Sequence, residues 1–220
     1  MFIKTIIILA KSAKNNNYCI AGIDVDTNEW VRPVSSDQSI SEAVPLDDVV
    51  CSDNIQLQVL DVVKMKFNDN LNDNPIQPEN LYYDEHYRWR KINEVSIRYV
   101  TGFHGFDNRN AIFYNYDRSI PEAEIKGMPQ LYRESLLLLP IENLSIDVEH
   151  RNGSPKFYAN FDYNGRQYKR FGVSDINVRN NFMDHKEGQY FLKKKANVVF
   201  SLTNPFHYNS KCYKMIAQVF

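Results

Sequence analysis

Two β-branched apolar runs near the start of the chain constrain its fold more than any other feature. Ile3–Ala10 and Tyr18–Val25 show no helical periodicity, and the polar segment Lys11–Asn17 joins them. A turn rich in Asp and Asn then leads into a third run, 30–34. Short apolar runs bounded by such polar clusters are typical of strands and hairpins. The start of the chain therefore predicts a β-structure.

The composition favours the same class. Aromatic residues favour strands, and the 220-residue chain has 14 Tyr and 13 Phe. It has 8 glycines, and neither a glycine-rich nucleotide loop nor a G-x-S-x-G nucleophile motif occurs. The cysteines, Cys19, Cys51 and Cys212, are far apart and form no C-x-x-C pair. This pattern argues against a disulfide framework and a zinc site, and we expect a protein of the reducing cytoplasm.

The strand-like runs form two groups, which predict a first barrel over 1–105 and a second barrel over 135–220, with an irregular connection over 106–134. Each group has about five short strands and one longer interruption, as a small Greek-key barrel of the oligonucleotide/oligosaccharide-binding (OB) kind requires. An SH3-like or PUA-like barrel fits the strand count nearly as well. We predict a mainly β fold of two tandem small OB-like barrels with one or two short helices.

Local signals add detail to this prediction. Asn164-Gly165 is the strongest hairpin turn in the chain, and Ser174 and Asp175 are both good N-caps for a helical turn in the connection 174–184. The segment 78–92 begins with a proline and has acidic early turns, so it predicts a short helix with extended ends. The apolar segment 95–100 predicts a strand.

Several segments carry a resemblance to a known family. The most specific are Lys11-Ser12-x-Lys14, Cys19-x-Ala21-Gly22, Trp30-x-Arg32-Pro33-Val34 and the ending Ser201-Leu202 … Tyr213-Lys214-x-Ile216-Ala217. Together they resemble the bacterial dual OB-containing domain family over residues 2–220. The resemblance implies two tandem OB-like barrels in one compact unit. It implies no catalytic residues, because the family has no agreed activity.

Charge is distributed unevenly along the chain, although the formal net charge is −1. Residues 33–63 contain six acids and no Lys or Arg, whereas residues 151–220 contain 12 basic and 4 acidic residues. A basic half beside an acidic or neutral half suggests a surface for anions, including nucleic acid. A solvated surface with uneven charge explains the same pattern.

The first candidate binding site surrounds the third apolar run. Trp30 and Arg32 alternate with Val31, so they lie on one face of a strand, where an aromatic plane beside a guanidinium suits a base and a phosphate. Lys11 and Lys14, in the loop between the first two strands, would edge the same groove. The competing interpretation is structural: Trp30 closes one end of a barrel, and Arg32 pairs with an acid such as Asp24.

The second candidate is the basic hairpin 156–170. Arg166, Tyr168 and Arg170 alternate on one face of the predicted strand, and Lys169 lies on the other. Basic residues between aromatic ones suit a platform for single-stranded nucleic acid. An exposed hairpin face with solvated cations is the equal alternative.

These features favour non-catalytic binding of nucleic acid or a nucleotide through basic and aromatic barrel surfaces. The alternatives are an accessory module that docks a protein encoded in the same operon and, third, an enzyme acting on nucleotides or nucleic acid. We predict no catalytic residues, no metal and no cofactor, since the five histidines fall in different segments and only Asp117, Glu124 and Lys126 loosely resemble a nuclease set. No apolar run is long enough to predict a membrane partner.

Overall fold

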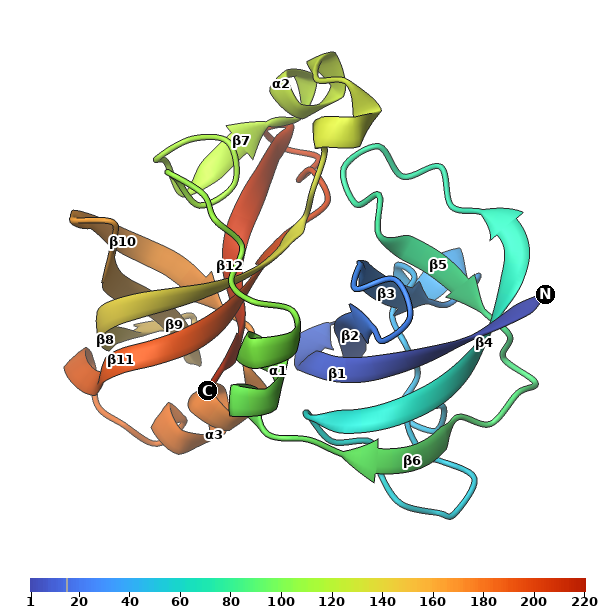
Figure 1. Ribbon diagram of the computed structural model, residues 1–220. Helices are drawn as coiled ribbons and strands as arrows, with labels where there is room; N and C mark the ends of the chain where they lie inside the picture. Colours follow the sequence, from blue (N-terminus) through green and yellow to red (C-terminus); the bar gives the residue numbers. More distant parts are fainter. Residues whose placement is uncertain (15) are drawn as a thin grey trace. The chain divides into compact units, whose positions relative to one another are not determined.

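The chain divides into two compact units, which can be followed in Figure 1. The structure, a computed structural model, describes residues 1–14 and 16–220, without the side chain of Leu71. The first unit contains Met1–Asn74 and Pro78–Gly105, and the second contains Pro75–Gln77 and Phe106–Phe220.

The first unit is built on a closed five-stranded barrel. Its strands are β1 (Phe2–Lys14), β2 (Asn17–Asp24), β3 (Trp30–Val34), β4 (Asp61–Leu71) and β5 (Asn80–Tyr83), with β6 (Arg90–Glu94) added to β4. β1, β2 and β3 pair antiparallel in sequence order. β5 then pairs in parallel with β3 and antiparallel with β4, which returns to β1. The ring β1-β2-β3-β5-β4-β1 has the connectivity of an OB-like Greek-key barrel.

The second unit repeats this connectivity. Its strands are β8 (Leu136–Arg151), β9 (Ser154–Tyr163), β10 (Arg166–Val173), β11 (Gly188–Leu202) and β12 (Lys211–Val219), and a short strand, β7 (Ser119–Pro121), pairs with β12. β8, β9 and β10 pair in sequence order, β12 lies parallel to β10, and β11 connects β12 to β8. The prediction of a mainly β protein with two OB-like barrels is confirmed.

The helices are short. They are the 3₁₀ turns η1 (Gln38–Ile40) and η2 (Gln130–Tyr132) and the α-helices α1 (Ile97–Phe103), α2 (Glu122–Gly127) and α3 (Ile176–Phe182). None of the described helices is both long and apolar enough to cross a membrane. α3 begins at the predicted cap, since the Oδ1 of Asp175 accepts a hydrogen bond from the amide of Val178 at 3.0 Å. Val178 and Phe182 of α3 pack into the second barrel's core.

Two local predictions are wrong. The segment 78–92, predicted as a helix, contains β5 and the start of β6, because pairing with β3 and β4 overrides its local helical signals. The segment 95–100, predicted as a strand, contains the start of α1. The hydroxyl of Ser96 accepts a hydrogen bond from the amide of Tyr99 at 3.1 Å, and this cap begins the helix.

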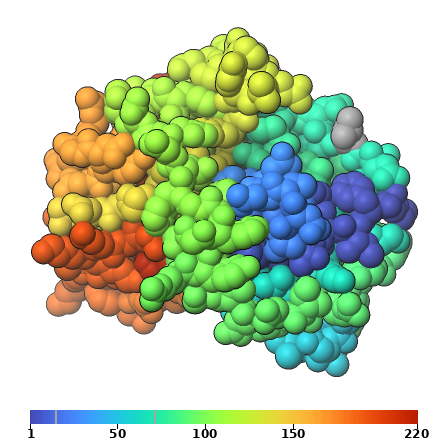
Figure 2. Space-filling view, in the orientation of Figure 1, coloured from blue at the N-terminus to red at the C-terminus, as the bar shows by residue number. Residues whose placement is uncertain are grey.

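The stretch 106–134 contains β7, α2 and η2 and contributes to the second core. Four of its side chains, Ile112, Phe113, Ile120 and Ile125, are buried in the same cluster as the inward-facing residues of the second barrel. Other residues of this stretch form part of the second unit's surface, in green to yellow in Figure 2.

Candidate functional site

A groove of ≈ 460 Å³ lies on the second barrel. It is lined by Arg118, Arg151, Tyr158, Arg170, Gly172, Phe206, Tyr208, Tyr213, Lys214 and Met215. These residues come from the second, third and fifth barrel strands, from the end of the first strand where it turns into the second, and from the loop between the fourth and fifth. Arg118 comes from the segment just before β7. OB barrels hold oligonucleotides and oligosaccharides on this face and between these loops. We refer to this site as the β9–β10 groove.

A β-bulge in β10 directs Arg170 toward the groove. The register between β9 and β10 shifts between Tyr168 and Phe171, and Arg170 has a left-handed backbone with φ +62°. Asn160 on β9 supports this conformation, since its Oδ1 accepts a hydrogen bond from the amide of Arg170 at 3.0 Å. An extra residue in a strand reverses the alternation of its side chains. Tyr168 therefore points into the core, whereas the Arg170 guanidinium lies over the Tyr158 ring, 4.4 Å from its centroid.

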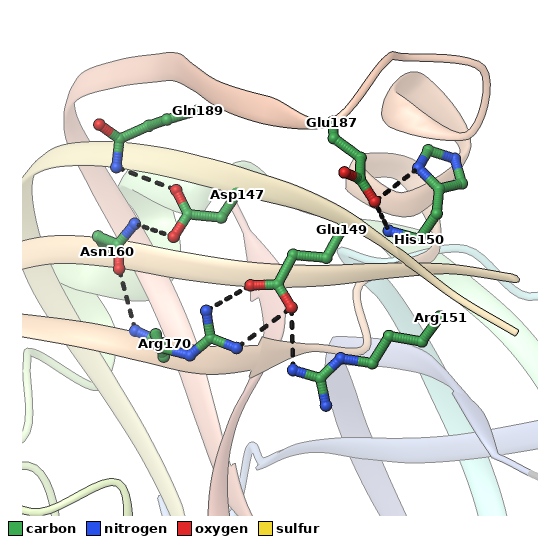
Figure 3. A network of polar contacts seen from close by, with 8 residues as sticks. All are labelled: Asp147, Glu149, His150, Arg151, Asn160, Arg170, Glu187 and Gln189. Carbon is green, nitrogen blue, oxygen red and sulfur yellow. Dashed lines mark hydrogen bonds and ion pairs between the residues drawn. The ribbon is translucent and has the colours of Figure 1, made fainter.

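A carboxylate on β8 connects two arginines of the groove (Figure 3). Both Nη atoms of Arg170 donate to the two oxygens of Glu149, and Nη2 of Arg151 donates to Oε2 of Glu149 at 3.0 Å. The hydrogen bond from Arg170 is the main cause that lowers the pKa of Glu149, and Arg151 adds to it. Glu149 is therefore a carboxylate at neutral pH.

Three aromatic side chains of the groove form a cluster of their own. The Phe206 ring packs against the rings of Tyr208 at 5.6 Å and Tyr213 at 5.2 Å. Asn209 donates to the Tyr213 hydroxyl at 2.9 Å and so links the β11–β12 loop to β12. The Tyr208 side chain is 77% exposed and is available for stacking. Arginines and aromatic side chains thus line one groove.

Lys214 differs from the other cations of the groove because it is buried. Its Nζ donates to the backbone carbonyl of Asn115 at 2.6 Å and to the Asn115 side-chain oxygen at 2.8 Å. Burial lowers the pKa of Lys214 to about 7, and Asp117 and Glu124 partly oppose this effect. Lys214 therefore holds the loop that carries Arg118, and near neutral pH its ammonium group is easily deprotonated.

The family comparison agrees with this architecture. The model of the dual OB-containing domain matches residues 4–219 of the chain. The chain belongs to this family. No curated protein and no solved structure gives a significant match to it. Family membership therefore supports two OB modules and leaves the ligand to be inferred from the groove.

The first predicted site of this dual OB protein is largely buried. Trp30 and Arg32 do lie on one face of β3, opposite the core residue Val31, but Arg32 is 2% exposed and its Nη1 donates to Asn80 at 3.2 Å. The half-buried Trp30 ring packs edge-on against His104 at 5.8 Å. Asp24, the suggested partner of Arg32, instead accepts hydrogen bonds from Lys4 and Thr27.

The two lysines predicted beside Trp30 are buried or half-buried in the first unit. Lys11 is buried, donates to the carbonyl of Leu57 at 2.8 Å and lies 4.6 Å from the centroid of the Tyr18 ring. Burial lowers the pKa of Lys11. Lys14 is half-buried at the end of β1. A phosphate contact by any of these first-unit residues remains an untested prediction.

In the second predicted site, the expectation of one shared face is wrong. Arg166 and Tyr168 precede the bulge and Arg170 lies in it, so the alternation reverses between Tyr168 and Arg170. Tyr168 stacks on Phe161 in the core at 5.5 Å. Arg166 is exposed and lies 3.8 Å from the centroid of the Tyr116 ring, while Lys169 is exposed. Among the eight predicted residues, Arg170 alone is a described lining residue of the β9–β10 groove.

Sequence reasoning missed most of the groove. The missed residues are Arg118, Arg151, Tyr158, Phe206, Tyr208, Tyr213 and Lys214. Tyr158 lies within the predicted basic hairpin, and Tyr213 and Lys214 lie within the family motif at the end of the chain, but none of the three was selected as a binding residue. The family resemblance could have revealed the groove. Placing the five-strand OB order on 135–220 selects the Asn152-Gly153 turn and the loop 203–210 as the ligand-binding loops.

A larger cavity of ≈ 770 Å³ on the same unit has a different chemistry. Its walls include the carboxylates of Glu142 and Asp162, the amides of Asn197 and Gln167, and Lys195. Lys195 lies 3.7 Å from Glu142, so its charge is partly neutralised. This lining does not suit a polyanion.

The described residues contain no group of three or more His, Cys, Asp or Glu side chains placed to hold a metal ion. The acids and lysine that loosely resembled a nuclease set are engaged in other contacts. Lys126 pairs with Glu122 at 2.5 Å on α2. The charges of Asp117 and Glu124 favour the protonated form of the buried Lys214 and so raise its pKa.

Proposed function

We propose that the second barrel binds single-stranded nucleic acid in the β9–β10 groove, without catalysing a reaction on it. One observation carries this proposal: three arginines and four aromatic side chains line the same groove, on the face where OB barrels hold oligonucleotides. Guanidinium groups bind phosphates in bidentate geometry, and aromatic rings stack on unpaired bases.

The arrangement favours a single strand over a duplex. Stacking on Tyr208 requires a base face, and in a duplex these faces are covered by neighbouring base pairs. Tyr208 projects from the β11–β12 loop, whereas Arg151 ends β8 and Arg170 lies on β10. A strand lying across β9 and β10 would place its bases toward the loop and its phosphates toward the arginines.

The stacking role is tested by Tyr208→Ala, measured by fluorescence anisotropy with a labelled single-stranded oligonucleotide. Loss of one stacked base is expected to weaken binding about 5-fold or more. Tyr132→Ala is the matched control, because Tyr132 is also exposed, at 67%, but lies on η2 outside the groove. Equal effects of the two substitutions would contradict a stacking site at Tyr208.

The electrostatic role is tested by titrating salt. If all three arginines of the groove neutralise phosphates, the logarithm of the binding constant should fall by about 2 per tenfold increase in salt, and by less where Glu149 keeps its contacts with Arg151 and Arg170. Affinity that stays constant from low to physiological salt would argue against capture of a phosphate backbone.

A further inference from the structure

We infer that the β9–β10 groove selects a strand that ends in a terminal phosphate, and that Glu149 sets this preference. The inference rests on the proposed function and names the class of ligand end that the groove accepts. It begins from the cluster in Figure 3, where Glu149 lies between Arg170 and Arg151 and contacts both.

Glu149 occupies the place of a phosphate. Both Nη atoms of Arg170 donate to its two oxygens, so that edge of the guanidinium is filled by an anion of the protein itself. Arg151 donates to the same carboxylate from the other side. Two of the three arginines of the groove are therefore partly neutralised before a ligand arrives.

An internal phosphodiester is a poor competitor for this position. It carries one negative charge on two free oxygens, as a carboxylate does. Glu149 is also tethered to β8, which gives it a high effective concentration beside the arginines. Replacing the Glu149 carboxylate by an internal phosphodiester at the two arginines therefore gains little binding free energy.

A terminal phosphate is a stronger competitor for the two arginines than an internal phosphodiester. It carries about −1.5 to −2 charges at neutral pH and has three free acceptor oxygens. It can therefore bridge Arg170 and Arg151 with more charge and more acceptors than Glu149 provides.

The surroundings allow this exchange. The Glu149 side chain is 29% exposed, so a displaced carboxylate can be hydrated rather than left unpaired in the core. Arg170 can stay in place, since Asn160 holds its backbone and its guanidinium rests on Tyr158. Asn160 is itself held by Asp147, which Gln189 also contacts.

The experiment compares internally labelled oligothymidylates of about 12 nucleotides that end in hydroxyl groups, a 5′-phosphate or a 3′-phosphate. An oligonucleotide one nucleotide longer controls for added charge. The wild-type protein should bind one or both phosphorylated ends about 5-fold more tightly than the hydroxyl ends. Inorganic phosphate should compete better than chloride at equal ionic strength.

Glu149→Gln should tighten binding of the hydroxyl-ended strand and bring the ratio of affinities near one. Glu187→Gln is the matched control. It removes the same charge from the same unit, but the Glu187 carboxylate lies beside His150, whose amide donates to it, rather than between the two arginines. This control should keep the wild-type ratio.

The outcomes separate the two proposals. Binding of every strand with equal affinity by the wild-type protein would overturn end selection and leave single-strand binding standing, whether or not the variants fold. A Glu149→Gln protein that keeps the wild-type ratio would overturn the role of Glu149. No binding of any strand would overturn both.

Discussion

At the scale of single residues, burial and local backbone decide what each cation can do. Arg32 and Arg170 both stood out in the sequence as basic residues beside aromatic ones. Arg32 is enclosed beside Asn80, whereas Arg170 reaches a groove because a bulge reverses its side chain. The two arginines have similar neighbours in the sequence, but the guanidinium group of Arg32 is buried and that of Arg170 lines the groove.

Lys214 provides a prediction about pH. Its folded pKa is about 7, against an ordinary value of 10.5, so between these values the unfolded chain binds a proton that the folded protein does not. Stability should therefore rise with pH across this window as the cost of burying the charge disappears. Urea unfolding between about pH 6.5 and 8.5 should show this rise, and Lys214→Met should flatten it.

The pH range ends at about 8.5 so that the ionisation of the cysteine thiols does not contribute to the measured stability. Burial raises the pKa of Cys212 to about 11 from an ordinary 9.0, which makes stability fall with rising pH near and above 9. Lys11, whose pKa is also lowered by burial, is present in both proteins and cancels in the comparison. Parallel slopes for wild type and Lys214→Met would refute the prediction.

At the scale of elements, close backbone contacts explain why particular small residues occur in the strands. Gly22 on β2 pairs with Ile8 on β1, and a Cβ at this position would lie 2.2 Å from the backbone oxygen of Ile7. A backbone atom cannot move aside as the end of a side chain can. The β1–β2 pair therefore requires glycine at this position, within one of the segments that carry the family resemblance.

Gly22→Ala should destabilise the protein by about 3 kcal/mol, because the strands must separate or bend to admit the methyl group. Gly102→Ala is the control. Gly102 lies in α1 with no atom near its missing Cβ, so alanine should be neutral or stabilise by about 0.5–1 kcal/mol. Equal midpoints of urea unfolding for the two variants would contradict the close-contact argument.

At the scale of the whole molecule, one short segment of the first half of the chain belongs to the second unit. Pro75–Gln77 belongs to the second unit although it lies in the connection between β4 and β5 of the first barrel. Ile76 is 2% exposed in the second unit's core, and the Nε2 of Gln77 donates to the carbonyl of Leu202 at 2.8 Å. The second core is therefore completed by residues that precede it by a long stretch of sequence.

Ile76→Ala should remove buried contacts from the second unit and destabilise it by about 2–4 kcal/mol. Hydrogen exchange followed by mass spectrometry should show faster exchange in peptides from β8 and β11. Leu46→Ala, at a site 51% exposed in a first-unit loop, should leave these peptides unchanged. Unchanged exchange in Ile76→Ala would mean that this side chain does not support the second core.

The sequence alone determined the features that depend on local energies. Strand-forming runs, the Asn164-Gly165 hairpin, the Asp175 cap and the basic character of residues 151–220 could all be read from neighbouring residues. Alternation and turn chemistry act over a few residues, so a pattern of the same length reveals them.

Only the tertiary structure decided how these pieces meet. The parallel pairs β3–β5 and β10–β12 close the barrels across long separations, and β5 forms against its own local signals. The β9–β10 groove gathers Arg118, Arg151 and Tyr208 from three distant segments, and the bulge that aims Arg170 depends on Asn160 of another strand. Strand order and register set these positions, and neither is encoded in a short stretch of residues.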